Sequence, residues 1–319
     1  MRDYRAALVT AAAAQKDKLD HFLAFILLWV PGVYAPIARS MWGIEGWGKN
    51  LGVIDFAGGS VVHICAGSTV LAHSVFHKFM LRKLEQAISS PNSITRRHRS
   101  SRKVSATSRT VDYVQRSTSS LDIRRPDTPT GATPIVEDID MIRYLLGMGL
   151  MWTGWFGLNA GNALGANLRA AVACVSTHLA ACTGAATMAI LFAIFDQSDD
   201  VDAGPDSRFQ RHRWRPNQFC NGAIVGLVAI SPGAGFVPHW ISPVFGVIPS
   251  IIVFLLYKPI RDIFGDESSV FAYHGVSGIV GMVLTGAFAK GSVAALDGIS
   301  LPDREHNGGG LDGYPKRVG

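Results

Sequence analysis

Charged residues are scarce in this sequence, and they are absent from long stretches of it. They make up 17% of the 319 residues, whereas soluble domains usually carry about a quarter. Six stretches contain no Asp, Glu, Lys or Arg, namely 21–38, 56–77, 144–168, 170–195, 216–257 and 270–289. Because a membrane-spanning helix needs roughly 20 largely apolar residues, this distribution disfavours a large soluble helical core and predicts a membrane protein.

Other features that the sequence lacks narrow the class further. The apolar runs show no alternation of period two, which a membrane β-barrel would require. There is no signal-peptide pattern, since Arg2, Asp3 and Arg5 precede only a short Ala-rich stretch. No metal-binding spacing is found among the four cysteines, which are interpreted as small packing residues rather than a disulfide framework: Cys65, Cys174, Cys182 and Cys220. No metal and no cofactor are therefore expected.

The charge-free runs predict an all-α integral membrane fold with about seven transmembrane helices. The run 216–257 is about twice the length of one span, and it carries Ser231-Pro232-Gly233 and Pro238 near its middle. Because proline ends or kinks a helix, this run is divided into two helices joined by a turn. Glycine and alanine are frequent in the spans, and such small residues let helices approach closely in lipid.

The positive residues indicate which side of the membrane is the cytoplasm. When the loops are assigned to alternating sides, most Lys and Arg residues fall on one side, Lys78, Arg82 and Lys258 among them. The other side carries few, including Arg39 and Arg169. Positive residues collect on the cytoplasmic side, so the N-terminus is expected inside and the C-terminus outside.

Composition divides the chain into four segments. Residues 1–83 hold about two spans and are expected to be part of a first repeat, and residues 136–300 hold about five and are expected to be a second. Residues 84–135 are basic, rich in Ser and Thr and nearly free of aromatic residues, which predicts a disordered cytoplasmic loop. It is interpreted as a solvated spacer, with anionic-lipid contact or phosphorylation as alternatives. Residues 301–319 form a polar tail.

Two histidines inside predicted spans share one pattern. Asp55 precedes His63 by eight positions, Asp266 precedes His274 by eight, and a glycine follows each histidine by four. Ionisable residues within a membrane are costly and suggest function, although either histidine taken singly would more often be structural. The two spans begin on opposite predicted sides, so the pattern indicates an inverted repeat with a site near the midplane. Two imidazoles that meet there could share a proton and pass it on.

Tryptophans supply a second candidate element. Trp42 lies in the predicted outer loop shortly before Asp55, where ring and carboxylate could hold a small cation. Trp152 and Trp155 lie on a span that is otherwise rich in small residues. The alternative for any one of them is the aromatic belt at the membrane interface. His178 lacks an Asp partner at the same spacing and is interpreted as structural.

Four motifs occur in a fixed order along the chain: Asp55-Phe-Ala-Gly-Gly-Ser-Val-Val-His63, Gly154-Trp-Phe-Gly-Leu-Asn-Ala-Gly161, Gly226-Leu-Val-Ala-Ile-Ser-Pro-Gly-Ala-Gly-Phe236 and Val270-Phe-Ala-Tyr-His274-Gly-Val-Ser-Gly-Ile-Val-Gly281. Together they resemble the ammonium transporter family (Amt/Mep/Rh), most closely its fungal or other eukaryotic Mep-type members. The resemblance implies an eleven-helix fold with two inverted five-helix repeats, assembled as a trimer with one pore per subunit.

The resemblance also assigns roles by position: a pore histidine pair, His63 and His274; an outer ammonium site, Trp42, Asp55 and Asn162; a pore lining or gate, Trp155 and Leu158; and a repeat-related acid, Asp266. Leu158 stands where the family has an inner-gate phenylalanine, and Asn162 where it has a serine. The predicted spans match the fourth to tenth family helices. The chain is thus expected to be truncated at both ends, as an incomplete gene model, a splice fragment or a decayed copy.

The function implied by the resemblance is ammonium/ammonia transport through a central pore with a proton relay at the two histidines. Such a protein would be a multi-pass protein of the plasma membrane and not an enzyme. Its expected partners are ammonium or ammonia, the lipid bilayer, and either two further copies or complete transporter subunits, with no nucleic acid. The alternative is a non-transporting ammonium sensor or a regulatory partner of complete subunits, and the chain alone is expected not to conduct.

Overall fold

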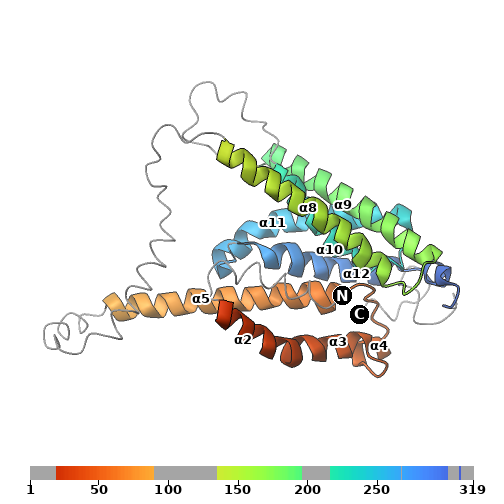
Figure 1. Ribbon diagram of the computed structural model, residues 1–319, viewed down its shortest axis with the longest axis horizontal. Coiled ribbons are helices and arrows are strands. Elements are labelled where there is room, and N and C mark those ends of the chain that lie inside the picture. The colour runs from red at the N-terminus through yellow and green to blue at the C-terminus, as the bar shows by residue number, and fades with distance from the viewer. Residues whose placement is uncertain (1–18, 90–134, 196–215, 267, 301–308, 310–319) are drawn as a thin grey trace. The chain divides into compact units, whose positions relative to one another are not determined.

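The computed structural model describes residues 19–89, 135–195, 216–266, 268–300 and 309. Within these ranges the regular structure is entirely helical, which confirms the all-α prediction (Figure 1). Five of the described helical segments are long and apolar enough to cross a membrane: Leu23–Asn50, Gly59–Met80, Leu168–Phe195, His239–Phe264 and Phe271–Phe288. The chain is a multi-pass membrane protein.

The chain forms two units, one made of Met1–Val75 with Leu145–Gly319 and the other of Phe76–Tyr144. Every residue of the predicted site falls in the first unit. In the second unit, helix α5 continues through Ser89 and α8 begins at Ile135. The first residues of the segment 84–135 are therefore helical, because Leu84, Glu85, Gln86 and Ala87 are good helix formers. Residues 90–134 of that predicted disordered loop, and all of the predicted tail but Gly309, lie outside the described residues.

The first apolar span is one helical rod with a change of pitch. It consists of α2 (Leu19–Trp29), η1 (Val30–Tyr34) and α3 (Ala35–Trp42), followed by the short α4 (Trp47–Asn50). The π-helical turn η1 contains Pro31, which lacks the N–H that a regular ladder would use. The rod lies beside the first part of α5 (Cys65–Ser89), where Trp29 Nε1 donates a hydrogen bond to Thr69 Oγ1 at 3.0 Å.

Among the remaining helices, α10 packs against α9, α11 and α12. The remaining helices are α8 (Ile135–Gly161), α9 (Leu168–Phe195), α10 (Pro216–Ile230), η4 (His239–Ile241), α11 (Ser242–Phe264), η5 (Phe271–Val276), α12 (Ser277–Phe288), α13 (Gly291–Ala294) and η6 (Ala295–Asp297). Figure 1 shows α9, α10 and α11 side by side. A Cβ atom at Gly226 of α10 would lie 2.1 Å from the carbonyl oxygen of Ala180 in α9. This contact is the small-residue packing that the sequence predicts.

The predicted division of 216–257 is confirmed. Helix α10 ends at Ile230, a run of turns follows from Ser231 to Phe236, and α11 begins at Ser242. With 15 residues, α10 is shorter than a typical span of roughly 20. It lies in the interior of the unit, because Val225, Leu227 and Val228 are wholly buried.

Candidate functional site

His63 and His274 meet in the interior of the first unit. Their Nδ1 atoms are 3.4 Å apart, and the two rings are tilted by 31° with centroids 5.5 Å apart. His63 is wholly buried and His274 is 7% exposed. Residues 211 positions apart in the sequence thus form one pair, and the repeated Asp-His spacing identified both of them.

Each histidine lies on a π-helical turn at the start of a span. His63 belongs to η2 (Gly59–Ile64), which continues into α5, and His274 belongs to η5, which continues into α12. Such turns are rare and are frequently found at functional sites. The two spans approach closely, since a Cβ atom at Gly67 would lie 2.6 Å from the backbone nitrogen of Gly275. The missing side chains let the two histidine helices come into contact.

Asp55 holds the N-terminal end of the His63 helix. Its Oδ1 accepts the backbone N–H groups of Gly58 at 2.8 Å and Gly59 at 2.6 Å. Its Oδ2 accepts both the N–H and the hydroxyl of Ser60, at 2.8 and 2.5 Å, and the N–H of Val61 at 3.2 Å. The first N–H groups of a helix have no partner within the helix, and a carboxylate there also complements the helix dipole. This buried carboxylate therefore orders the start of the histidine span.

Asp266 plays the same part for His274. Its carboxylate accepts the N–H groups of Val270 at 3.2 Å and Phe271 at 2.9 Å, and the hydroxyl of Ser268 at 3.4 Å. Asp266 is wholly buried. Burial raises the pKa of the Asp266 carboxyl, while the bonds that it accepts act in the opposite direction. The eight-residue spacing in the sequence therefore corresponds to two capped helices, each with a histidine inside.

Ser231 joins the histidine pair to a tryptophan. Trp155 Nε1 donates to Ser231 Oγ at 3.0 Å, and His63 Nε2 lies 3.3 Å from the same oxygen. The Trp155 ring also stacks on His63, with centroids 5.3 Å apart and an interplanar angle of 11°. Sequence reasoning read Ser231 as the end of a helix and missed this role. The signal was available, because Ser231 lies in one of the four family motifs.

The bonds at Ser231 are consistent with one assignment of the protons on the pair, since the roles of the ring nitrogens depend on the tautomer. In this assignment the Ser231 hydroxyl donates its one hydrogen to the carbonyl of Leu227 at 2.8 Å, and Trp155 and His63 both donate to its oxygen. In neutral His63 the hydrogen is then on Nε2, and Nδ1 is an acceptor. His274 Nδ1 must therefore carry the hydrogen between the two rings. The ring nitrogen that keeps a lone pair for another proton is His274 Nε2.

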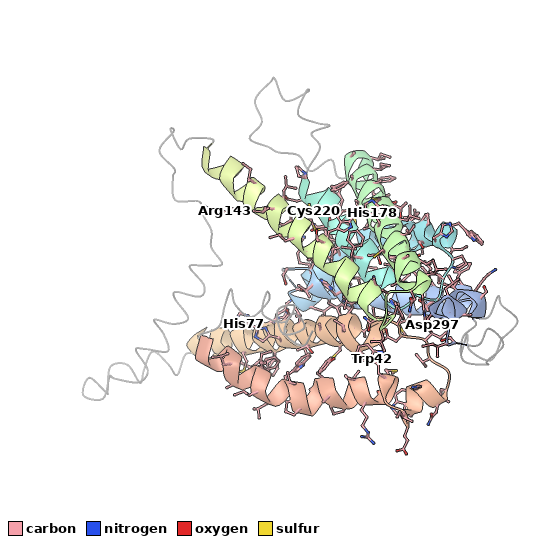
Figure 2. All side chains as sticks on the ribbon, turned by 45° about the vertical axis from the view of Figure 1, so that its right-hand side comes forward. Trp42, His77, Arg143, His178, Cys220 and Asp297 are labelled. Carbon is pink, nitrogen blue, oxygen red and sulfur yellow. The ribbon has the colours of Figure 1, made fainter. Side chains whose placement is uncertain are left out.

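The predicted outer residues are positioned from α3 and the C-terminal end of α8. Trp42, labelled in Figure 2, is partly buried and donates from Nε1 to the backbone carbonyl of Asp55 at 2.7 Å. Asn162 donates from Nδ2 to the carbonyl of Leu158 at 2.6 Å. Leu158 is 9% exposed and belongs to the same hydrophobic cluster as Trp155. The structure thus brings Trp42 to Asp55 and Leu158 to Trp155, whereas the hydrogen bond that Asn162 donates stays within its own segment.

Metal chemistry receives no support from the side chains that the structure describes. Among the described residues, no three His, Cys, Asp or Glu side chains are grouped so that they could hold a metal ion.

His178 lies apart from the histidine pair, and its ring centroid is 5.7 Å from that of Trp152 and 6.0 Å from that of Phe156. Its Nε2 lies 3.6 Å from Cys182 Sγ, one helical turn away.

Known proteins that resemble this chain include ammonium transporters. The Ammonium Transporter Family model matches residues 4–97 and 124–311. Ammonium transporter 1 of Schizosaccharomyces pombe is 34% identical over 295 residues, which are 92% of this chain and 46% of that protein.

Solved structures lead to the same family. Crystal structures of Mep2 match with TM-scores of 0.67 for the Saccharomyces cerevisiae protein and 0.66 for the Candida albicans protein, at 28% and 29% identity. Each match covers 98% of this chain, and 57% and 55% of those two chains. The chain spans about half the length of the curated relatives that it matches. The family model nevertheless covers most of its residues, and the chain belongs to the ammonium transporter family.

Proposed function

We propose that this chain supplies the histidine-paired part of a path that carries ammonium and ammonia across the plasma membrane. The observation that carries the proposal is the buried Nδ1–Nδ1 contact of 3.4 Å between His63 and His274. An ionisable pair deep inside a membrane protein is costly to keep and is a functional site by default. The ammonium transporters among its relatives name the substrate.

The chemical step follows from the proton positions. Ammonium that reaches the pair breaks one N–H bond, its proton forms a bond to His274 Nε2, and ammonia is released. The hydrogen that His274 carries on Nδ1 can then move to His63 Nδ1 across the shared contact. The face of the Trp155 ring, stacked at 5.3 Å on His63, favours a positive charge on that imidazole. Reversal of the steps re-forms ammonium.

Residues at the outer end of the path are proposed to bind ammonium and to order the start of the His63 helix. Trp42 and Asp55 are proposed to form the outer ammonium site, with Asn162 nearby and with Trp155 and Leu158 lining the path. The Asp55 carboxylate acts mainly through the helix that it caps, because it accepts five hydrogen bonds from residues 58–61. Asp266 is proposed to do the same in the second repeat. The chain is further proposed to work as a homotrimer or beside complete transporter subunits.

The test is uptake of labelled methylammonium into liposomes by this chain joined to the remaining helices of a full-length relative, because the chain alone is expected not to conduct. We expect uptake by this completed protein that is lost in His274→Ala and kept in His178→Ala, which removes a histidine outside the pair. Equal uptake in both variants would contradict the proposal. If the unaltered chain gives no uptake alone but changes the uptake of a complete transporter reconstituted with it, the regulatory alternative is supported instead.

A further inference from the structure

Arg169 is a buried cation at the predicted outer end of the molecule. It is the second residue of α9 and is 8% exposed. Its Nε donates to the carbonyl of Gly235 at 2.8 Å, and its Nη1 bonds Asp297 Oδ2 at 2.9 Å. Buried charges are costly unless they are paired and hydrogen-bonded. A buried arginine with this set of contacts needs an explanation, and the proton relay described above does not use it.

The guanidinium also packs between two phenylalanine rings. Its central carbon lies 4.3 Å from the ring centroid of Phe236 and 5.0 Å from that of Phe56. Those two rings meet edge to face at 5.8 Å and 88°. Gly235 leaves room for this arrangement, since a Cβ atom there would lie 2.5 Å from the Phe56 ring. Arginine suits such a position because its planar fork stacks and donates in several directions at once.

The segments that Arg169 joins are those that hold the histidine pair. Phe56 follows Asp55, the cap of the His63 helix, and Phe236 ends the run of turns that begins at Ser231. Backbone bonds connect the same two segments, from the Phe56 N–H to the Pro232 carbonyl and from the next N–H to the Ser231 carbonyl, both at 3.0 Å. The side chain of Ser231 in turn contacts His63 Nε2.

Asp297 makes the cation tolerable at this place. Its carboxylate also accepts the N–H groups of Ile299 and Ser300 and the Ser300 hydroxyl, at 2.7–2.8 Å. Figure 2 labels it in the segment that follows α13. An unpaired positive charge close to the entry of a cation path would repel the substrate. Pairing with Asp297 therefore allows the Arg169 guanidinium to make its contacts while its positive charge is neutralised near the cation path.

We propose that Arg169 is a positioning residue for the histidine pair: it clamps the Ser231–Phe236 turns against the segment after Asp55, so that the Ser231 hydroxyl stays on His63 Nε2, while Asp297 neutralises it. The proposal rests on the proposed function only for its effect on transport. The position of the Ser231 hydroxyl and the tautomer of His63 can be measured without transport.

The first measurement is nitrogen-15 NMR of the whole chain with labelled histidine in detergent. The His63 resonances are identified by their loss in His63→Gln, and Ser231→Ala gives the spectrum of a released imidazole. We expect Arg169→Lys, which keeps the charge but cannot reach both acceptors and both rings, to move the His63 signals toward those of Ser231→Ala. The matched control is Arg261→Lys, which alters an exposed arginine paired with its neighbour Asp262 at 3.0 Å.

The second measurement is methylammonium uptake, over a range of concentrations, by this chain joined to the remaining helices of a full-length relative. We expect Arg169→Lys to lower the maximal rate by roughly tenfold, since small displacements in a site have effects of this order or larger. Asp297→Asn keeps the arginine bond to Gly235 but leaves the charge unpaired, so it should raise KM with a smaller change in maximal rate. An Arg169→Lys protein with unaltered His63 signals, or one that transports as Arg261→Lys does, would overturn the positioning role. Absence of uptake by the unaltered completed protein would count against the proposed function only, because the NMR result stands by itself.

Discussion

Asp55 and Asp266 stand at equivalent positions in the two histidine spans, and each carboxylate accepts the first N–H groups of the π-helical turn that carries its histidine. Asp55 accepts hydrogen bonds from residues three to six positions after it in the sequence, and Asp266 accepts them from residues two to five positions after it. The spans have opposite predicted orientations, so the two caps are predicted to lie at opposite ends of the proposed path. This arrangement gives the inverted repeat a local physical meaning.

The first prediction concerns the Asp55 cap. In Asp55→Ala the N–H groups of Gly58, Gly59 and Val61 lose their acceptor, and helix caps of this kind contribute about 1–2 kcal/mol. We expect a lower melting temperature of the chain in detergent and abolished methylammonium uptake by the protein completed with the remaining helices of a relative. Asp262→Asn, at a side chain that is 65% exposed, serves as the control and should alter neither. Uptake at the original level in Asp55→Ala would reject the role of Asp55 at the outer end.

The second prediction concerns the close approach of the histidine helices. Gly67→Ala places a methyl group 2.6 Å from the Gly275 backbone nitrogen, so the helices must separate. Overpacking of this kind costs about 1–3 kcal/mol, and the Nδ1–Nδ1 contact should lengthen. Gly154→Ala is the matched control, because a methyl group there meets no described atom within 4 Å. The melting temperature and the rate of methylammonium uptake should fall for Gly67→Ala alone. Equal melting temperatures and uptake rates in the two variants would contradict the packing argument.

The third prediction contrasts two buried serines. Ser231→Ala leaves Trp155 Nε1 and His63 Nε2 without their acceptor, and an orphaned buried donor costs about 1–3 kcal/mol. Ser277 is also wholly buried, but its hydroxyl has no partner among the described residues. Ser277→Ala should therefore be neutral or slightly stabilising. We expect reduced uptake and stability for Ser231→Ala only. A larger loss of uptake and stability in Ser277→Ala than in Ser231→Ala would contradict the assignment of Trp155 and His63 as donors to the Ser231 oxygen.

Several parts of the site could be predicted from the sequence, and the reasons are local. The spacing from Asp to His was visible because a cap and the side chain it orders lie on one continuous helix. The turn after Ile230 was visible because Pro232 and Gly233 interrupt the apolar run. The charge-free runs marked the spans because lipid excludes unpaired charge.

Long-range contacts could not be predicted in the same way. Ser231 contacts His63 across 168 positions and Arg169 contacts Asp297 across 128, and no periodicity links such partners. Arg169 was counted as one of the few positive charges on the outer side, which says nothing about its burial. The bond of Asn162 to Leu158 is local, but a position inferred from resemblance does not reveal the direction of a side chain. Helix α5 also runs past the predicted start of the basic loop.

The last prediction concerns acid and the Arg169–Asp297 pair. Burial by itself would raise the pKa of Asp297, but the hydrogen bonds from Ser300 and Ile299 and the Arg169 guanidinium together hold that pKa well below its usual range. A carboxyl group whose pKa is lower in the folded protein stabilises the fold above its unfolded pKa, and this stabilisation is lost as pH falls through the folded value. The melting temperature of the unaltered chain should therefore exceed that of Asp297→Asn by a constant margin from pH 7 down to about pH 5. The margin should shrink only at more acidic pH. A margin that already disappears between pH 7 and about pH 5 would show that Asp297 is not held ionised by these partners.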